Sequence, residues 1–434
     1  MSAQLDATRS APPPPPPADS YWDNPAASDP NRLVDPQQPV AADPAALLAQ
    51  APRAAIDDAV RIDGTDTNPQ QRTKGQTPDG KTIQIDPLHQ GNEVSIAREQ
   101  TLADAGQGRT YISTDQVVLS TGAKNDQVQV TQRDDGTLDV GVNGEKYEVR
   151  LGENQELTIR SGAGNDTINV AANVKVNIVV DAGAGDDQIV TGAGNDRIDG
   201  GIGNDRISTG AGRDDVFGNS GDDVLDAGSG DDVVYGGDGA DRLAGGDGVD
   251  FLEGGKGNDT LEGGAGKDML SGGLDDDTLR GGDGDDAVYT GAGKDTVDNQ
   301  SGNDTVYAQT AADLINAATG AKNTVINVEI SASKGVTIEG SDAFKQRVGA
   351  EIDFLRSSPN GQQMLAEFDK AAARGNTVTI KELANEQNGY AQTFSNDADI
   401  VNGKPGKGGD VQINYNPSFH MAEFPAPVVV LYHE

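Results

Sequence analysis

The chain has 434 residues and a formal net charge of −37 at pH 7, and it contains no cysteine. It therefore needs no disulfides, and it lacks the basic face with which nucleic-acid-binding proteins neutralise phosphates. No segment approaches the roughly 20 consecutive apolar residues of a membrane span, so the composition argues against a nucleic-acid partner and against a membrane span.

The first segment, residues 1–109, is rich in Pro, Ala, Asp and Gln and includes the run Pro12–Pro17. Such a composition cannot bury an apolar core, so we expect a disordered tail. The proline run is expected to form an extended polyproline spacer. The first thirty residues have no positively charged start followed by an apolar run, so we expect export without a cleaved signal peptide.

Strand-like runs begin near Tyr111 and continue to Ile159. Two degenerate copies of a nine-residue motif accompany them: residues 121–129 read T-G-A-K-N-D-Q-V-Q, and residues 161–169 read S-G-A-G-N-D-T-I-N. Asp126 and Asp166 occupy the sixth position of these copies. Terminal repeats are usually atypical because they close the exposed end of a solenoid, so this stretch is interpreted as N-terminal coils and a cap.

The motif becomes regular between Ala182 and Tyr307, where G-G-x-G-x-D-x-U-x repeats without insertion and U is a large aliphatic residue. The sixth position of the fourteen copies is always aspartate: Asp187, Asp196, Asp205, Asp214, Asp223, Asp232, Asp241, Asp250, Asp259, Asp268, Asp277, Asp286, Asp295 and Asp304. The eighth position is always aliphatic, from Ile189 to Val306.

Each copy combines a turn with a short strand. Glycine tolerates the positive backbone angles of a tight reversal, and the D-x-U-x half alternates sides, so the aliphatic residue can point inward. Two copies then make one coil of eighteen residues. Copies eighteen residues apart stack, which predicts one ladder through Asp187, Asp205 and onward, and a second through Asp196, Asp214 and onward. Stacked carboxylates repel each other.

A hard divalent cation between successive coils would relieve this repulsion with about six oxygen ligands from aspartates and turn carbonyls, which suits calcium better than magnesium. Residues 182–307 carry 29 acidic and 8 basic residues, which favours cation binding over a generally acidic surface. Binding and folding are expected to be one event. Asn219, Asp275 and Gln300 replace motif glycines, so sites near them are less regular.

The repeat resembles the RTX (hemolysin-type) calcium-binding nonapeptide of secreted bacterial proteins, which implies a mainly β fold, a right-handed parallel β-roll, over residues 110–332. The resemblance also implies structural calcium at the fourteen sixth-position aspartates and an interaction with secretion machinery. Type I secretion is usual for such proteins, but no C-terminal signal follows these repeats, so a type III route is the other candidate.

The pattern changes after about Ser333. Residues 344–356 place apolar side chains at helical spacing, S-P-N-G at 358–361 interrupts them, and a second helix is expected at 361–374. Residues 377–380 and 411–415 read as strands. These elements predict a small α+β unit over 333–434, separate from the roll.

The chain ends in an apolar run followed by His433 and Glu434, the way an H-E-x-x-H helix starts. The order of helix, turn, helix, strands and P-A-P-V-V-V-L-Y-H-E resembles the NleD-like family of effector zinc metallopeptidases over about 340–434. The resemblance implies His433 as first zinc ligand and Glu434 as general base. His89 and His420 cannot occupy the +4 position, residue 437, so we expect a truncated motif and an inactive chain.

Two functions remain open. The first is a secreted bacterial, toxin- or effector-like zinc metallopeptidase with a calcium-folded roll, whose substrate is a host protein and whose zinc binds only if the motif is completed. The alternative is a non-enzymatic calcium-binding RTX adhesin or surface and matrix protein. A histidine at position 437 would favour the first.

Overall fold

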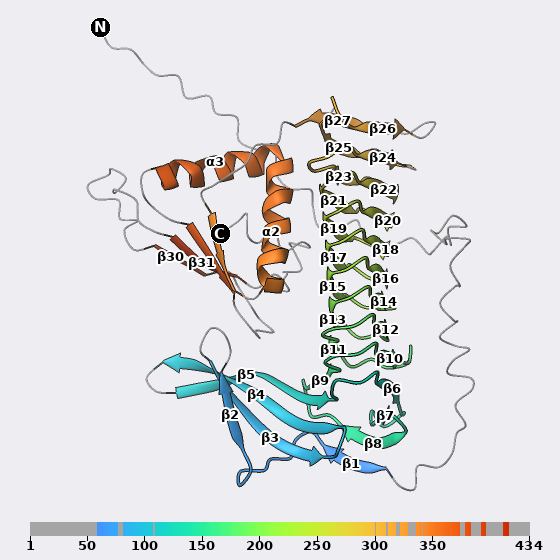
Figure 1. Cartoon of the computed structure of the whole chain (residues 1–434), viewed down its shortest axis with the longest axis vertical. Coiled ribbons are helices and arrows are strands. Elements are labelled where there is room, and N and C mark those ends of the chain that lie inside the picture. Colours follow the sequence, from blue (N-terminus) through green and yellow to red (C-terminus); the bar gives the residue numbers. More distant parts are fainter. Residues whose placement is uncertain are drawn as a thin grey trace, which may run out of the picture. The chain divides into compact units, whose positions relative to one another are not determined.

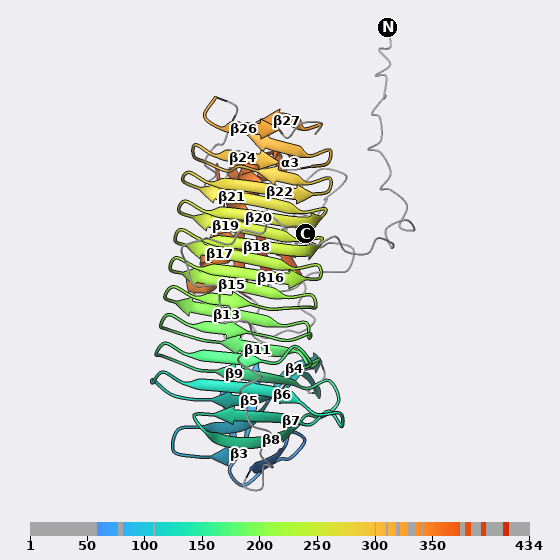
Figure 2. The ribbon, with the colours of Figure 1, turned by 90° about the vertical axis from the view of Figure 1, so that its right-hand side faces the viewer.

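The computed structural model describes residues 59–76, 81–106, 109–299, 301–309, 311–317, 322–328, 336–340, 342–373, 378–382, 392–395 and 411–415. Within these residues the fold is mainly β, a solenoid flanked by an N-terminal cap and followed by a small α+β region (Figures 1 and 2). No helix in the described ranges is long and apolar enough to cross a membrane.

Two long sheets form the solenoid in the described part of the chain. In spatial order, the first sheet contains β1 (Val60–Asp63), β8 (Glu145–Arg150), β7 (Leu138–Val142), β6 (Gln127–Gln132), β10 (Thr167–Val170), β12 (Gln188–Val190), β14 (Arg206–Ser208), β16 (Val224–Ser229), β18 (Arg242–Gly248), β20 (Thr260–Gly266), β22 (Thr278–Asp283), β24 (Thr296–Asn299) and β26 (Leu314–Ala317).

The second sheet contains, again in spatial order, β2 (Thr73–Gln76), β3 (Thr82–Gln90), β4 (Ser95–Gly106), β5 (Arg109–Ser120), β9 (Glu156–Arg160), β11 (Ile178–Asp181), β13 (Arg197–Ile202), β15 (Asp215–Ser220), β17 (Val233–Asp238), β19 (Phe251–Lys256), β21 (Met269–Leu274), β23 (Ala287–Tyr289), β25 (Thr305–Ala308) and β27 (Thr324–Asn327).

The chain alternates between the two sheets, and each coil returns to the same sheet after eighteen residues. Leu225 pairs in parallel with Leu243 in the first sheet, and Val234 pairs with Leu252 in the second. The eighth-position residues from Ile189 to Val306 are all buried, and they fill the space between the sheets. The predicted coil and its aliphatic core are therefore confirmed.

The period lengthens toward the N-terminal end, as expected for capping coils. Ile168 pairs with Ile189, twenty-one residues on, and Val128 pairs with Ile168, forty residues on. The additional residues of the long coil form the antiparallel pair β7 and β8.

The prediction of a disordered tail up to residue 109 is wrong for residues 60–106, which contain β1 to β4. β2 to β5 form an antiparallel meander, and β5 joins it to the parallel coils through β9. Ile62, Val94 and Ile96 are buried in this cap. The average composition concealed these strands, because their apolar residues are few and become buried when the strands pair with one another and with β5 and β8. Residues 1–58 lie outside the described residues.

The C-terminal region contains α2 (Asp342–Ser357), α3 (Pro359–Ala373) and a four-stranded sheet. The order of that sheet is β28 (Val336–Glu339), β29 (Val378–Glu382), β31 (Val411–Tyr415) and β30 (Gln392–Ser395). The two helices, their break at Ser358 and the strands at β29 and β31 agree with the sequence pattern, whereas β28 and β30 were not predicted.

The interpretation of this region as separate from the roll is wrong, because α2 packs on the second sheet. Phe344, Val348 and Leu355 share one buried cluster with Phe217 and Phe251 of the solenoid. The helical spacing was recognised, but its partner surface is formed by residues eighteen apart, which linear patterns do not group. The domain boundaries near residues 109 and 332 remain predictions.

Candidate metal sites

The sixth-position aspartates are buried at the edges of the coils, directly before each strand. Each is at most 3% exposed. Their Oδ1 atoms accept hydrogen bonds along the solenoid: the backbone N–H of Asp241 donates to Asp259 Oδ1 at 2.8 Å, and that of Asp250 donates to Asp268 Oδ1 at 3.0 Å. The same bond recurs at eighteen-residue intervals, so the structure contains the two ladders that the repeat predicts.

In thirteen of these fourteen carboxylates, all but that of Asp304, the second oxygen has no hydrogen-bond partner among the described residues. Buried, unpaired Oδ2 atoms belong to Asp187, Asp205, Asp223, Asp232, Asp241, Asp250, Asp259, Asp268, Asp277 and Asp286, among others. A buried carboxylate oxygen without a partner is costly in free energy. Such an atom recurs along the repeats, so the solenoid has a series of positions that a positively charged ligand would stabilise.

The surroundings of Oδ2 suit a hard cation. A Cβ atom built on Gly254 would lie 2.4 Å from Asp259 Oδ2 and 2.6 Å from the carbonyl oxygen of Gly272 in the next coil. The carboxylate oxygen of one coil and a turn carbonyl of the next therefore converge where the motif has no side chain. Calcium is bound by such mixtures of carboxylate and carbonyl oxygens.

Carboxylate side chains do not cluster around a common point in the described residues. In the described ranges no group of three or more His, Cys, Asp or Glu side chains converges to hold a metal ion. This agrees with a site of one or two carboxylates and several backbone oxygens between coils, and the absence of cysteine removes soft-metal ligands.

Burial raises the pKa values of the ladder carboxyls. Desolvation is the largest cause in each case, and neighbouring aspartates of the same ladder add to it. The pKa is raised to about 6 for Asp187 at the N-terminal end, to about 8 for Asp223, and to about 9 for Asp277. Without a cation, carboxyls such as Asp223 and Asp277 would therefore favour the protonated form near neutral pH, and a bound cation would favour their charged form.

Two replacements of motif glycines leave the turns intact. Asn219 and Asp275 both adopt positive φ angles, 73° and 76°. Asparagine and aspartate tolerate this left-handed conformation better than other side chains. The coils around them keep their ladder bonds, whereas Gln300 lies outside the described residues.

The degenerate copies extend one ladder beyond the regular repeats. The backbone N–H of Asp126 donates to Asp166 Oδ1, and that of Asp166 donates to Asp187 Oδ1, both at 2.7 Å. Asp166 Oδ2 is also buried and unpaired. The sixth-position aspartates of the two degenerate copies thus belong to the same ladder as Asp187.

A further series of hydrogen bonds, on the surface and formed by fifth-position residues, was not predicted. Asp or Asn at the fifth position accepts from the backbone one coil later: the N–H of Asn204 donates to Asp186 Oδ1 at 2.9 Å, and that of Asp222 donates to Asn204 Oδ1 at 2.8 Å. The frequent N-D and D-D pairs of the motif were a visible signal for it.

The residues of the predicted zinc motif cannot be placed. His433, Glu434 and His420 lie outside the described residues. His89 lies in β3 of the N-terminal cap, where its ring contacts the edge of Tyr147 with ring centres 5.4 Å apart. Their predicted roles remain predictions.

Comparison with known families identifies both regions. A family model described as RTX calcium-binding nonapeptide repeat (4 copies) matches residues 158–172, 181–216 and six overlapping segments that end at residue 321. The chain carries RTX calcium-binding repeats. A peptidase M91 family model, described as effector protein, matches residues 332–434. No curated protein matches the chain.

The RTX repeats imply calcium binding, and they cover the coils whose aspartates form the two ladders. An M91 domain next to RTX repeats fits a secreted, effector- or toxin-like protein. Neither match favours the alternative of a non-enzymatic adhesin.

Proposed function

We propose that this protein is a secreted zinc metallopeptidase effector whose RTX repeats are folded by calcium. The observation that supports the enzymatic part is the match of residues 332–434 to a peptidase family, over a segment that includes the His433-Glu434 pair. The buried, unpaired Oδ2 atoms of the ladders support the calcium part.

The roles proposed for the chain's own residues follow from their chemistry. His433 would bind zinc through an imidazole nitrogen, and Glu434 would take a proton from the attacking water. Zinc, when bound, would polarise the peptide carbonyl and lower the pKa of that water. Two further ligands are required, one of them a histidine at residue 437, which would lie one helical turn after His433.

The site residues of the calcium part are proposed to be the fourteen sixth-position aspartates. Calcium would stabilise the fold there, because these residues lie at the edges of the solenoid, supply no nucleophile and do not line an open substrate cleft. The proposed setting is extracellular, where calcium is plentiful, with passage through secretion machinery and delivery to a host cell. A host protein is the proposed substrate of the peptidase.

The proposal is tested first by reading the gene beyond the codon for Glu434. A histidine codon at position 437 supports the zinc motif, and any other residue there removes it. In the protein that contains the whole motif, His433→Ala should lose bound zinc. Glu434→Gln should retain zinc but lower the rate of peptide hydrolysis by about a hundredfold or more, as expected for loss of a general base.

A further inference from the structure

The outer face of the second sheet changes character along the solenoid. Residues at the seventh and ninth positions point away from the core, because they alternate with the buried eighth position. In β13 these residues are Arg197 and Asp199. From β15 to β23 most of them are apolar, namely Phe217, Val233, Tyr235, Phe251, Met269 and Tyr289. We call these six residues the docking stripe.

The first sheet has no such stripe in the same coils. Its outward residues there include Arg242, Glu262, Thr278 and Arg280. The repeat motif leaves the seventh and ninth positions unspecified, so the apolar residues are not required for the solenoid. Their restriction to one sheet and to consecutive coils points to a surface built for a partner.

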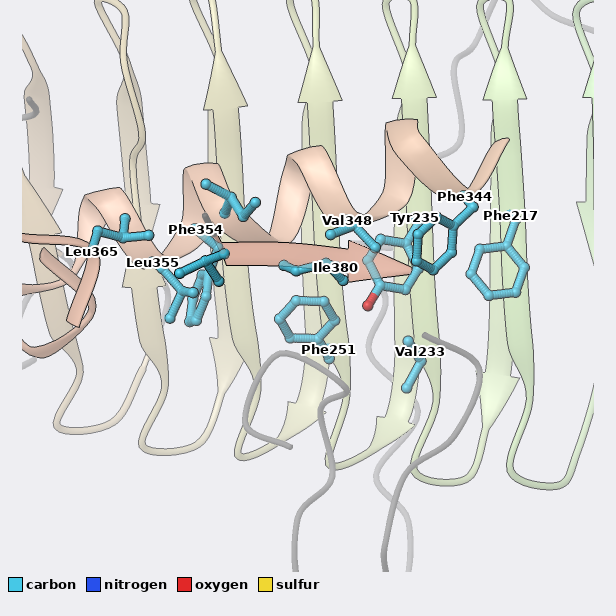
Figure 3. Close-up of a cluster of buried hydrophobic side chains, with 12 residues drawn as sticks. Phe217, Val233, Tyr235, Phe251, Phe344, Val348, Phe354, Leu355, Leu365 and Ile380 are labelled. Atoms are coloured by element: carbon cyan, nitrogen blue, oxygen red, sulfur yellow. The ribbon is translucent and has the colours of Figure 1, made fainter. Parts of the chain in front are cut away.

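The partner is α2. Its residues Phe344, Val348 and Leu355 belong to one buried cluster with the docking stripe (Figure 3), and Ile352 is buried in the same cluster. Phe354 contacts Phe251 and Tyr289, with ring centres 5.8 Å and 4.5 Å apart. The side-chain amide of Gln346 donates a hydrogen bond to the backbone carbonyl of Asn219 at the edge of this interface.

Ladder aspartates directly determine where the stripe residues lie. Asp232 and Asp250 immediately precede Val233 and Phe251 in the chain. The backbone N–H of Phe251 donates to the carbonyl of Asp232 at 2.9 Å, while the N–H of Asp232 donates to Asp250 Oδ1 at the same distance. The ladder aspartates, whose carboxylates are buried, thus also hold the backbone that carries the stripe side chains.

The stripe exists only while coils are stacked. In sequence, Phe217, Tyr235 and Phe251 are separated by sixteen to eighteen residues. In an extended chain they would lie too far apart for one helix face to contact all three. Stacking brings the rings of Phe217 and Tyr235 to 5.3 Å and those of Tyr235 and Phe251 to 5.6 Å. Whatever stabilises the stack therefore creates the binding surface for α2.

We propose that the docking stripe is a calcium-dependent attachment site for the M91 region of the same chain. Calcium at the aspartates of the second-sheet edge, Asp214, Asp232, Asp250, Asp268 and Asp286, aligns the stripe, and α2 binds to it. Removal of calcium disorders the stripe and releases α2. The M91 region is then held on the solenoid in a calcium-rich medium and set free in a calcium-poor compartment. This inference rests on the proposed function insofar as the aspartates are calcium ligands.

Hydrogen exchange measured by mass spectrometry on the full chain tests the proposal. The double variant Asp250→Asn and Asp268→Asn keeps the Oδ1 acceptors but removes two charges beneath α2. At a calcium concentration that folds the native chain, it should speed exchange in residues 342–357 by about tenfold, because opening of the site becomes easier. The control variant Asp187→Asn and Asp196→Asn also removes two ladder charges, one from each ladder and both away from the stripe, and it should leave this exchange unchanged.

A second variant separates docking from coil formation. Phe251→Ser removes a stripe ring without changing a ladder residue, and it should speed exchange in residues 342–357 by about a hundredfold, as expected when a buried aromatic ring is lost. β11 to β14 should remain protected. Lys256 and Lys345 line the same interface cavity, so a short amine-reactive cross-linker should join them with calcium and not with excess chelator.

The possible outcomes separate docking of α2 from calcium-driven folding of the coils. Protection of α2 and the Lys256–Lys345 cross-link that persist in chelator, while the coils exchange freely, overturn the docking proposal and leave calcium-driven folding intact. Coils that exchange equally slowly with and without calcium overturn the calcium role of the repeats itself. Equal effects of the two double variants on α2 also contradict the proposal, because they show no local dependence on the stripe.

Discussion

At the residue scale, the motif aspartate performs two separate tasks. Its Oδ1 atom accepts a backbone hydrogen bond from the preceding coil, which continues the ladder without any metal. Its buried Oδ2 atom has no protein partner and converges with a turn carbonyl of the next coil. A glutamate side chain is one methylene longer and would displace the carboxylate. Asparagine would still accept the backbone hydrogen bond but would offer no charged oxygen to a cation. This accounts for the strict use of aspartate in the regular repeats.

Replacing Asp259 by asparagine should therefore raise the calcium concentration needed for folding while keeping the coil hydrogen bond. Replacing it by alanine should raise that concentration further, since the buried N–H of Asp241 loses its acceptor, at a cost of about 1–3 kcal/mol. Calcium titration followed by circular dichroism measures both effects. Asp247→Asn, which removes an exposed charge from the same coil region, is the matched control. An Asp259→Asn variant with a native calcium midpoint would argue against a ligand role.

Protons and calcium should compete for the ladders. Folded-state pKa values raised to about 8, as for Asp223 and Asp268, exceed the unfolded value of about 3.9. Without calcium, the folded chain then binds more protons than the unfolded chain, so its stability is greatest below about pH 4 and is lost as pH rises toward 8. With calcium, lowering the pH from 8 to 6 should raise the calcium midpoint. Titrations at three pH values measure this, and a midpoint independent of pH would contradict it.

At the element scale, the solenoid depends on how its N-terminal end is closed. The meander β2 to β5 is fixed to the first coil by a polar group centred on Asp115. Its carboxylate accepts two hydrogen bonds from Arg98 and one each from Gln100 and Gln155. Arg160 of β9 also pairs with Glu99 of β4 through two bonds of 3.0 Å. These side-chain bonds tie β4 and β5 to each other and to the first coil at Gln155 and Arg160.

Asp115→Ala should loosen this cap before it affects the repeats. The variant leaves the half-buried Arg98 guanidinium and two amide groups without their acceptor, and we expect a loss of about 2 kcal/mol in local stability. Hydrogen exchange should become faster in residues 95–120 and remain slow in residues 224–290. Arg61→Ala, which breaks an exposed pair with Glu148, should change stability by less than about 1 kcal/mol. Equal effects of the two variants would contradict the role given to Asp115.

At the scale of the whole molecule, folding of the solenoid is opposed by the burial of many negative charges. Residues 182–307 carry 29 acidic and 8 basic residues, and their ladder carboxylates are buried along both edges. Hydrophobic burial of one aliphatic residue per repeat favours stacking, while burial of one carboxylate per repeat opposes it. Cations between the coils reverse the second contribution, which makes metal binding part of folding.

The full chain should therefore change from a largely disordered to a β-rich spectrum when calcium is added. Circular dichroism in excess chelator and during calcium titration measures the change, which is expected within residues 110–330. Because each coil contacts its neighbours and the proposed cations would lie between coils, the transition should be cooperative. Magnesium at equal concentration should be much less effective, since it gives up its water ligands reluctantly. A folded spectrum in excess chelator would refute calcium-driven folding.

Much of this protein could be predicted from local patterns, for reasons specific to repeats. The nine-residue period determines which residues stack, so the buried eighth positions and the two ladders follow from spacing alone. The helices α2 and α3 follow from helical periodicity and the break near Pro359. By contrast, the strands β1 to β4 gain their buried residues through pairing with other strands, and their own composition resembles that of a disordered tail.

The sequence by itself determined the coil, its core and the chemistry of its edges, because residues at a fixed period meet the same environment in every coil. Only the tertiary structure decided which carboxylate oxygen is satisfied by the backbone and which is left for a cation. It alone also placed α2 on the docking stripe. Both depend on contacts between residues that lie far apart in the chain and become neighbours only when the coils stack.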